Sequence, residues 1–151
     1  IENGDLVVFD FGCVYQGYCS DMTRTVGVGE LSKAQKDLYN LVLKAQTSAL
    51  KMAEAGVVGE KMQDHVQAIF DKAGFGSYFG HGLGHSVGLD IHEEPRFSRN
   101  VKEKIPAGTV ISVEPGLYVP GIGGVRIEDL IVLTEGGHEN LTTSSKALLM
   151  V

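Results

Sequence analysis

Five side chains that could bind divalent metal ions are spread along this chain. They are Asp10, Asp21, His85, Glu114 and Glu128. Four of the five lie in strand-like stretches, which would hold their side chains rigidly. Hard carboxylates with one imidazole suit ions such as Mn²⁺, Co²⁺ or Zn²⁺, and four carboxylates exceed what a single catalytic zinc ion usually takes. The set therefore predicts a hydrolytic site that contains two metal ions.

A glycine-rich stretch at 80–95 carries three of the five histidines: His81, His85 and His92. Neutral imidazole binds such metal ions, and histidines beside a metal ligand can hold or transfer protons near pH 7. The stretch contains no H-E-x-x-H pattern and lacks the third glycine of a dinucleotide-binding loop, so neither a zincin nor a Rossmann domain is indicated. The two remaining histidines are expected to be structural or solvated: His65 and His138.

The acidic residues also have alternative interpretations. Asp10 and Asp21 fall on neighbouring predicted strands, where antiparallel pairing brings partners on one face within about 5 Å. Burying an unpaired carboxylate costs several kcal/mol, so Asp10 needs a partner, but it could instead cap the turn at Gly12. Strand alternation would place Arg126 and Glu128 on one face of their strand. A simple ion pair between these two residues is the alternative to a metal-binding role.

The composition bounds the class of protein. At 151 residues with 43% hydrophobic content, the chain can bury one ordinary core, so a single domain is expected. The formal net charge is −6 and no basic run occurs, so nucleic acid and anionic membranes are not expected partners. No apolar run reaches roughly 20 residues, the length that spans a bilayer. Cys13 and Cys19 lack C-x-x-C spacing, which predicts reduced thiols and a cytoplasmic protein.

The hydrophobic pattern predicts a mixed α and β domain. In the N-terminal third, turn signals at Gly12 and Gly17 separate apolar stretches rich in β-forming residues. This third is predicted to form a three-stranded β-meander. The strands are expected at 6–11, 14–18 and 21–28.

Two amphipathic helices are predicted in the middle of the chain. Ser32 and Gln35 match a capping box, and apolar residues follow at helical spacing until Gly56. A second helix is expected at 60–73, with Gly74 as its stop signal. The apolar stripe of the first helix should pack into the core.

The C-terminal half is predicted to be rich in loops and strands. Residues 74–88 carry a glycine density that is incompatible with a regular helix and typical of a backbone that approaches a ligand closely. Prolines at 95 and 106 mark a polar loop, and two glycines at 136–137 mark a turn. Further strands are expected at 109–113, 125–134 and 147–151.

Six motifs, taken in order, closely resemble those of the pita-bread metallopeptidases. They are Asp10, Ser20-Asp21-Met22-Thr23-Arg24-Thr25, His81-Gly82-x-Gly84-His85, His92-Glu93-x-Pro95, Glu114-Pro115-Gly116 and Gly124-Val125-Arg126-Ile127-Glu128-Asp129. The resemblance covers essentially the whole chain, and within the superfamily it is to the Xaa-Pro branch, prolidase and aminopeptidase P. Methionine aminopeptidases share the five ligands but typically lack the first histidine of the His-x3-His pair and the Ser-Asp-x-Thr-Arg-Thr segment. Creatinase-like and chaperone relatives lose ligands that this chain retains.

The resemblance implies an α+β pita-bread (creatinase/aminopeptidase-like) fold. It also implies a metal-dependent exopeptidase that hydrolyses the Xaa-Pro bond of dipeptides or peptide N-termini through a metal-bridging hydroxide. Proline-containing peptides would be the substrates, and a homodimer is common among such relatives. A methionine aminopeptidase and a non-catalytic peptide-binding module on the same fold are the alternatives.

Specific roles follow from the same resemblance. Two divalent ions are implied, with Mn²⁺ expected ahead of Co²⁺ or Zn²⁺. Asp21 and Glu128 would bridge the ions, Asp10 would chelate one of them, and His85 and Glu114 would complete the other. Glu114 would double as general base. The expected substrate contacts are His81, His92 and Arg126, and His81 and His92 would also serve catalysis.

One feature departs from the family pattern. Relatives carry a substrate-contacting histidine and a first α/β half upstream of the first ligand, whereas only nine residues precede Asp10 here, and the first of them is Ile rather than Met. We therefore expect residues 1–151 to be a single catalytic domain that is truncated on its N-terminal side, the ligand-bearing C-terminal part of a longer protein.

Overall fold

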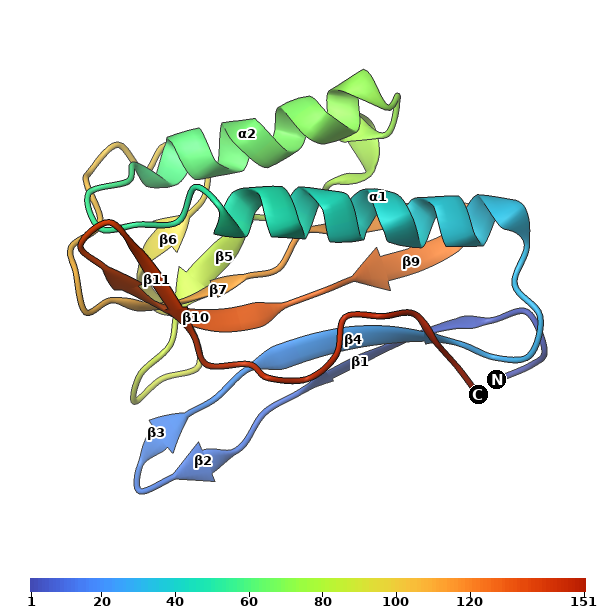
Figure 1. Cartoon of the computed structure of the whole chain (residues 1–151), viewed down its shortest axis with the longest axis horizontal. Helices are drawn as coiled ribbons and strands as arrows, with labels where there is room; N and C mark the ends of the chain where they lie inside the picture. The colour runs from blue at the N-terminus through green and yellow to red at the C-terminus, as the bar shows by residue number, and fades with distance from the viewer.

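The N-terminal strands form one long antiparallel hairpin. In the computed structural model, which describes residues 1–151, β1 (Leu6–Phe11) pairs with β4 (Met22–Gly27). At the far end of this hairpin, β2 (Val14–Tyr15) pairs with β3 (Tyr18–Cys19) (Figure 1). The predicted meander with a single strand at 14–18 is wrong. Gln16 and Gly17 have positive φ angles of 50° and 87°, so the chain reverses there in a two-residue turn.

The first helix begins, and the second helix ends, on a local signal that the sequence predicted. The Ser32 hydroxyl accepts from the Gln35 amide and the Gln35 side chain accepts from the Ser32 amide, which completes the predicted capping box of α1 (Lys33–Leu50). Helix α2 (Gly59–Lys72) is followed by Gly74 at a φ of 81°, as predicted for a helix stop.

The first helix is shorter than its apolar spacing predicted. It ends at Leu50 rather than continuing to Gly56. The amides of Met52 and Ala53 donate only three residues back, to Ala49 and Leu50, and the next amides leave the helix. The amide of Ala55 donates to the carbonyl of Thr134 and that of Gly56 to the carbonyl of Ile105. These bonds tie the end of α1 to the strand region beneath it.

A five-stranded sheet occupies the C-terminal half, in the order β11-β10-β7-β5-β6. A separate pair, β8 with β9, and the short strand β12, which runs parallel to β4, complete the strands. Strand β6 at the sheet edge was not predicted, because Pro95 was interpreted as a loop residue. The bounds are β5 (Gly84–Ser86), β6 (Glu93–Phe97), β7 (Val110–Val113), β8 (Gly116–Val119), β9 (Gly123–Arg126), β10 (Asp129–Thr134), β11 (Gly137–Asn140) and β12 (Leu149–Met150), with a 3-10 turn η1 (Gly76–Tyr78).

The predicted single strand at 125–134 is two strands. Strand β9 pairs with β8, whereas β10 pairs with β7 and β11, so the chain changes sheets at Ile127–Glu128. The alternation argument that placed Arg126 and Glu128 on one face of a strand therefore fails, since Glu128 lies outside both strands.

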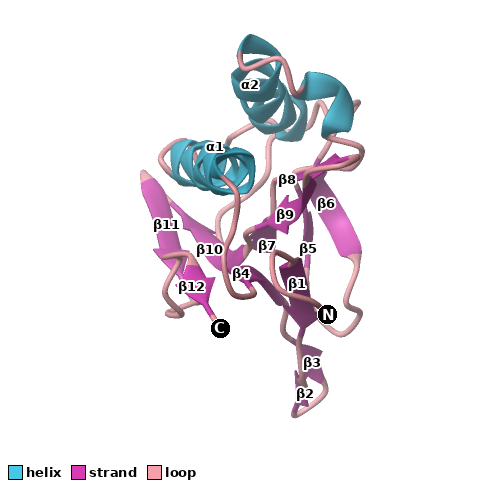
Figure 2. Ribbon diagram, turned by 90° about the vertical axis from the view of Figure 1, so that its right-hand side faces the viewer, coloured by secondary structure: helices cyan, strands magenta, loops and turns pink.

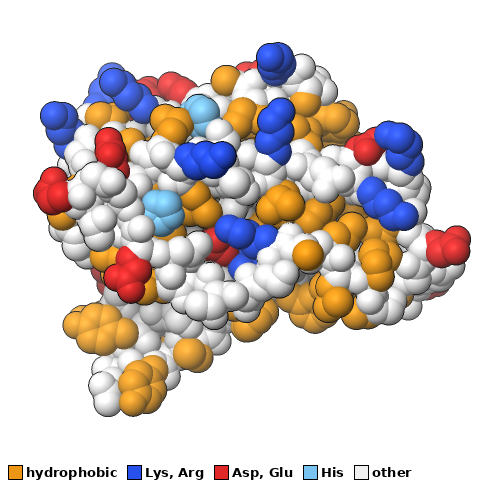
Figure 3. Space-filling model, viewed as in Figure 1, with side chains coloured by type: hydrophobic (Ala, Val, Ile, Leu, Met, Phe, Trp, Pro, Cys, Tyr) orange, Lys and Arg blue, Asp and Glu red, His pale blue; other side chains and the backbone are white.

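The core lies between the helices and the strands they cover (Figure 2). Val42 and Ala45 of α1 and Val66 and Phe70 of α2 are fully buried against strand residues such as Ile111, which confirms the predicted apolar stripes. Neither helix combines the length and the apolar character needed to cross a membrane. Exposed apolar side chains gather on the projecting β2–β3 hairpin, as Figure 3 shows: Val14, Tyr15 and Tyr18.

Candidate metal centre

One open cavity of about 530 Å³ brings together every side chain that the sequence singled out for chemistry. Five more residues share its wall and had no assigned role. The predicted residues are Asp10, Asp21, His81, His85, His92, Glu114, Arg126 and Glu128, and the additional ones are Gly82, Gly84, Arg96, Ser98 and Tyr118.

The proposed ligands come from five separate elements. Asp10 lies within β1 and His85 within β5, but the other three lie beside strands rather than in them. Asp21 immediately precedes β4, Glu114 immediately follows β7, and Glu128 occupies the gap between β9 and β10. The expectation that four ligands sit within strands is therefore wrong. Strand ends free the backbone from pairing, which lets side chains from different sheets turn into one cavity.

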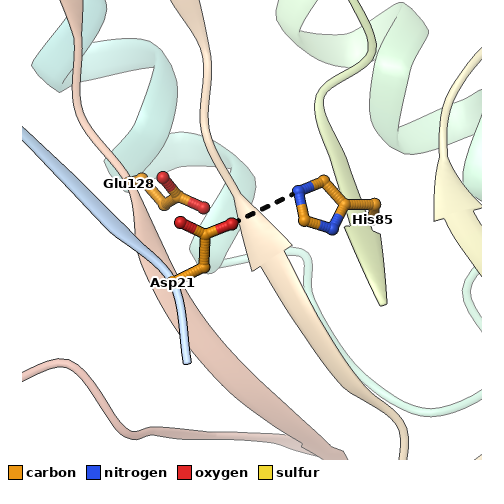
Figure 4. Close-up of side chains that lie close together, drawn as sticks. All are labelled: Asp21, His85 and Glu128. Atoms are coloured by element: carbon orange, nitrogen blue, oxygen red, sulfur yellow. Dashed lines mark ion pairs between the residues drawn. The ribbon is translucent and has the colours of Figure 1, made fainter. Parts of the chain in front are cut away.

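Asp21, His85 and Glu128 form the tightest group. Each offers a ligand atom, and these atoms all lie within 4.8 Å of one another (Figure 4). The Nε2 atom of His85 lies 3.6 Å from Asp21 Oδ2 and 3.2 Å from Glu114 Oε1. A cluster of oxygen and imidazole nitrogen atoms at such spacing fits a hard or borderline divalent cation.

Glu128 is the most strongly perturbed group in the cavity. Its side chain is 1% exposed, and burial together with the negative charges of Glu114 and Asp21 raises its pKa to about 8. One oxygen, Oε2, accepts a 2.6 Å hydrogen bond from the Thr23 hydroxyl, whereas the buried Oε1 has no partner. Burial and Asp10 likewise raise the pKa of Asp21. Clustered buried carboxylates with an unpartnered oxygen are costly alone, and a bound divalent cation would compensate them.

His85 and Glu114 form an ion pair across the cavity. Burial alone would lower the pKa of His85, but its hydrogen bond to Glu114 and the Glu114 charge raise the pKa overall. Burial would raise the pKa of Glu114, but His85 outweighs it and lowers the pKa, with help from the Ser112 hydroxyl at 3.0 Å. A histidine must be neutral to bind a metal ion, so metal binding at His85 competes with protonation of its ring.

Arg126 is paired with Asp10. Its Nη2 donates to Asp10 Oδ2, and its Nη1 donates to the Tyr118 hydroxyl at 3.0 Å. The simple ion pair between Arg126 and Glu128, which was the alternative, therefore does not form. The alternative of Asp10 as the cap of the turn at Gly12 is replaced by this contact, which fixes the Asp10 carboxylate at the cavity wall.

The two further histidines flank the ligand group. The His92 ring lies edge-on to the His85 ring, with centroids 4.3 Å apart. His81 packs edge-on against Phe79, and its buried Nε2 has no hydrogen-bond partner. Gln63 of α2 fixes this loop, because it donates to the carbonyl of His81 at 3.3 Å and accepts from the amide of Leu83 at 2.6 Å. Both rings are thus available to a ligand in the cavity.

Two glycines are required by close approach. A Cβ on Gly84 would lie 1.9 Å from the backbone oxygen of Ser112, since β5 passes directly beside β7. A Cβ on Gly116 would lie 2.9 Å from both His81 Nε2 and the Tyr118 hydroxyl. Contacts below 3.0 Å force the neighbouring atoms to shift. Gly84 lies in the 74–88 stretch that was predicted to approach a ligand closely, but the atom it approaches belongs to Ser112, so the approach to a ligand stays a prediction.

Sequence reasoning missed several residues of the site. Tyr118 and Arg96 carried no spacing signal, because each reaches the cavity through tertiary contacts alone. Gln63 could have been found as a polar residue on the buried face of a predicted helix. Outside the cavity, His65 lies 2.7 Å from the Ser48 hydroxyl and His138 lies 3.2 Å from the Ala53 carbonyl, consistent with structural roles.

The chain is similar to known peptidases along its whole length. A family model described as metallopeptidase family M24 matches residues 1–135. The Xaa-Pro dipeptidase of Pyrococcus horikoshii is 46% identical over 149 residues, which cover 99% of this chain and 42% of that protein. The Xaa-Pro dipeptidase of Pyrococcus furiosus is 45% identical, with 99% and 43% covered. This chain thus spans about two fifths of the length of these relatives.

Solved structures give the same result. The Xaa-Pro dipeptidase from Bacillus anthracis aligns with a TM-score of 0.98 at 46% identity, covering 100% of this chain and 42% of that one. The X-Pro aminopeptidase from Thermotoga maritima aligns with a TM-score of 0.97 at 43% identity, covering 100% and 43%. These neighbours confirm the predicted pita-bread fold, of which the chain represents one part.

Proposed function

Because this chain belongs to the metallopeptidase family M24, we propose that it carries the metal centre of an enzyme that hydrolyses the peptide bond before proline. The observation that supports this most strongly is the convergence of all five ligand-type side chains in one cavity beside His81 and His92. Relatives that are Xaa-Pro dipeptidases at 45–46% identity point to the same substrate class. The activity is proposed for the full-length protein, with residues 1–151 as one catalytic domain within it.

The ligand set fits two divalent ions. We assign Asp21 and Glu128 to both ions, Asp10 to one, and His85 with Glu114 to the other. The unpartnered Oε1 of Glu128 and the like charges around it support this assignment. When bound, the ions supply Lewis acidity and lower the pKa of a coordinated water, so that a nucleophile forms near neutral pH. Carboxylate and imidazole ligands accept Mn²⁺, which we propose ahead of Co²⁺ or Zn²⁺.

The other groups in the cavity handle protons and the substrate. Glu114 keeps its carboxylate ionised beside His85, so it can accept a proton from the attacking water as general base. The Nδ1 of His81 donates to the Gly82 carbonyl at 2.8 Å, so the unpartnered Nε2 accepts in the neutral ring; in the imidazolium form it can donate to an oxygen carrying developing negative charge or to the leaving imino nitrogen of proline. His92, stacked on His85, is placed to contact the same substrate group.

Arg126 was expected to contact the substrate, and we propose a less direct role for it. Its Nη2 and Nη1 are engaged by Asp10 and the Tyr118 hydroxyl, which favours orientation of a ligand carboxylate over direct capture of the substrate. Arg126 therefore acts on the substrate only through Asp10 and Tyr118 in this arrangement.

The two alternatives receive less support. A non-catalytic peptide-binding module would have no need for five retained ligands around a single cavity. A methionine aminopeptidase would typically lack His81 and the Ser20–Thr25 motif, and both are present.

Three peptides separate these possibilities. The full-length protein loaded with Mn²⁺ is expected to hydrolyse Ala-Pro, Ala-Pro-Ala or both, and to leave Met-Ala-Ser intact. The Asp21→Asn variant is the control for contaminating peptidases, because it removes a proposed ligand. Hydrolysis of Met-Ala-Ser alone would favour methionine aminopeptidase, and no hydrolysis of any peptide by a metal-loaded protein would favour the binding module.

A further inference from the structure

The segment that carries Glu128 has no strand partner of its own. It lies where the chain leaves β9 and has not yet entered β10, so no sheet ladder fixes it. Hydrogen bonds to β4 hold the segment in place instead. The Glu128 amide donates to the Thr23 carbonyl at 3.1 Å, the Arg24 guanidinium donates to the Glu128 carbonyl, and the Thr25 hydroxyl exchanges hydrogen bonds with the Arg126 backbone.

Within this attachment, only the Thr23 side chain touches the Glu128 carboxylate. Its hydroxyl is fully buried and lies 2.6 Å from Glu128 Oε2 and 3.0 Å from Arg126 Nε. A guanidinium nitrogen can only donate, so the Thr23 oxygen accepts from Arg126. The single hydroxyl proton is then committed to Glu128. This fixed direction holds Oε2 and leaves the buried Oε1 without a partner, free for a ligand.

We propose that Thr23 is a positioning residue for the metal centre, a role that rests on the proposed function. It acts through Glu128, by locking the rotation of the carboxylate so that it presents its oxygens to the cavity. It also couples Arg126, and through it Asp10, to Glu128 without direct contact between Arg126 and Glu128. Groups that orient metal ligands in this way typically contribute about 10- to 100-fold to metal affinity.

The neighbouring Thr25 provides a matched control. It lies on the same strand two residues on, faces the same segment and is similarly buried, at 2% exposure. Its hydroxyl bonds only to the backbone of Arg126, not to a ligand side chain. Loss of the Thr25 hydroxyl therefore tests the effect of removing a buried hydrogen bond from the same region.

The test is a calorimetric titration of the metal-free full-length protein with Mn²⁺, together with its thermal unfolding midpoint. The variants are Thr23→Val, Thr23→Ser, Thr25→Val and Glu128→Gln. Thr23→Val is expected to weaken Mn²⁺ binding about 10- to 100-fold. Thr23→Ser, which keeps the hydroxyl, should restore the affinity, and Thr25→Val should lower the unfolding midpoint without that loss of affinity.

The possible outcomes distinguish a failure of the positioning role from a failure of the proposed metal centre. Suppose that Glu128→Gln abolishes Mn²⁺ binding. The positioning role would then be overturned if Thr23→Val kept the wild-type Mn²⁺ affinity, or if Thr25→Val lost as much affinity as Thr23→Val. A Thr23→Val protein that failed to fold even with Mn²⁺ present would also overturn it, since the role would then be structural. If Glu128→Gln bound Mn²⁺ as the wild type does, the proposed metal centre would itself be wrong.

Discussion

The buried carboxyl of Glu128 should make the metal-free protein less stable as the pH rises. Its pKa is about 8 in the folded chain against an ordinary value of 4.5. A carboxyl whose pKa is raised by folding binds its proton more tightly in the folded state. Its contribution to stability is therefore fully present below pH 4.5 and is lost as the pH rises to about 8.

The size of the effect follows from the shift. Each pKa unit corresponds to about 1.4 kcal/mol, so the free energy of unfolding should fall by at most about 5 kcal/mol across this window. The raised pKa values of Asp21 and His85 act in the same direction. The lowered pKa values of Glu114 and Asp129 act oppositely, but their contribution is already complete above their ordinary values of 4.5 and 3.8.

Urea unfolding of the chelator-treated protein at pH 5 to 8.5 measures this directly. Glu128→Gln replaces the carboxyl with a neutral amide, so most of the pH dependence should disappear and the variant should be the more stable protein at pH 8.5. Glu139→Gln removes an exposed carboxylate on β11 and should leave the wild-type slope unchanged. Equal slopes in the wild type and Glu128→Gln would refute the reasoning that links burial of this group to the metal site.

Three further predictions concern the centre. Asp21→Asn should lower Mn²⁺ affinity and abolish turnover while the far-UV circular dichroism stays unchanged; full activity would contradict its assignment as a ligand. Gly84→Ala should displace β5, and with it His85, from Ser112, so that turnover falls and the unfolding midpoint drops. The control Gly121→Ala lies at an exposed turn with open space around it, so it should lower stability only by the strain of its positive φ. Mn²⁺ at 100 times its dissociation constant should stabilise the metal-free protein by about 2.7 kcal/mol for each ion bound, reversibly with chelator, and an unchanged midpoint would contradict specific binding to the folded state.

Local signals in the sequence predicted local structure well. The capping box of Ser32 and Gln35 and the stop at Gly74 depend only on neighbouring backbone groups, so both are confirmed. Strand division was less predictable. The apolar run at 125–134 continues through Ile127, and nothing in its spacing reveals that the partner strand changes there. Pro95 falls in β6, where an edge position spares the missing amide from the ladder.

The convergence of the candidate side chains was predictable, but their contacts were not. The eight side chains converge as the motifs implied. The pairing of Asp10 with Arg126, separated by 116 positions, depends on how β1 and β9 lie in space. The Thr23 hydroxyl was part of a motif, yet its role emerges only from the direction of two hydrogen bonds that meet on one buried oxygen.

We propose that five side chains hold two divalent ions in one cavity. Calorimetric titration of the metal-free full-length protein with Mn²⁺ tests it most directly, because it counts the ions bound per chain. Two ions per chain, with both lost or severely weakened in Asp21→Asn and Glu128→Gln, is the predicted result. No binding, or binding that both variants leave unchanged, would contradict it.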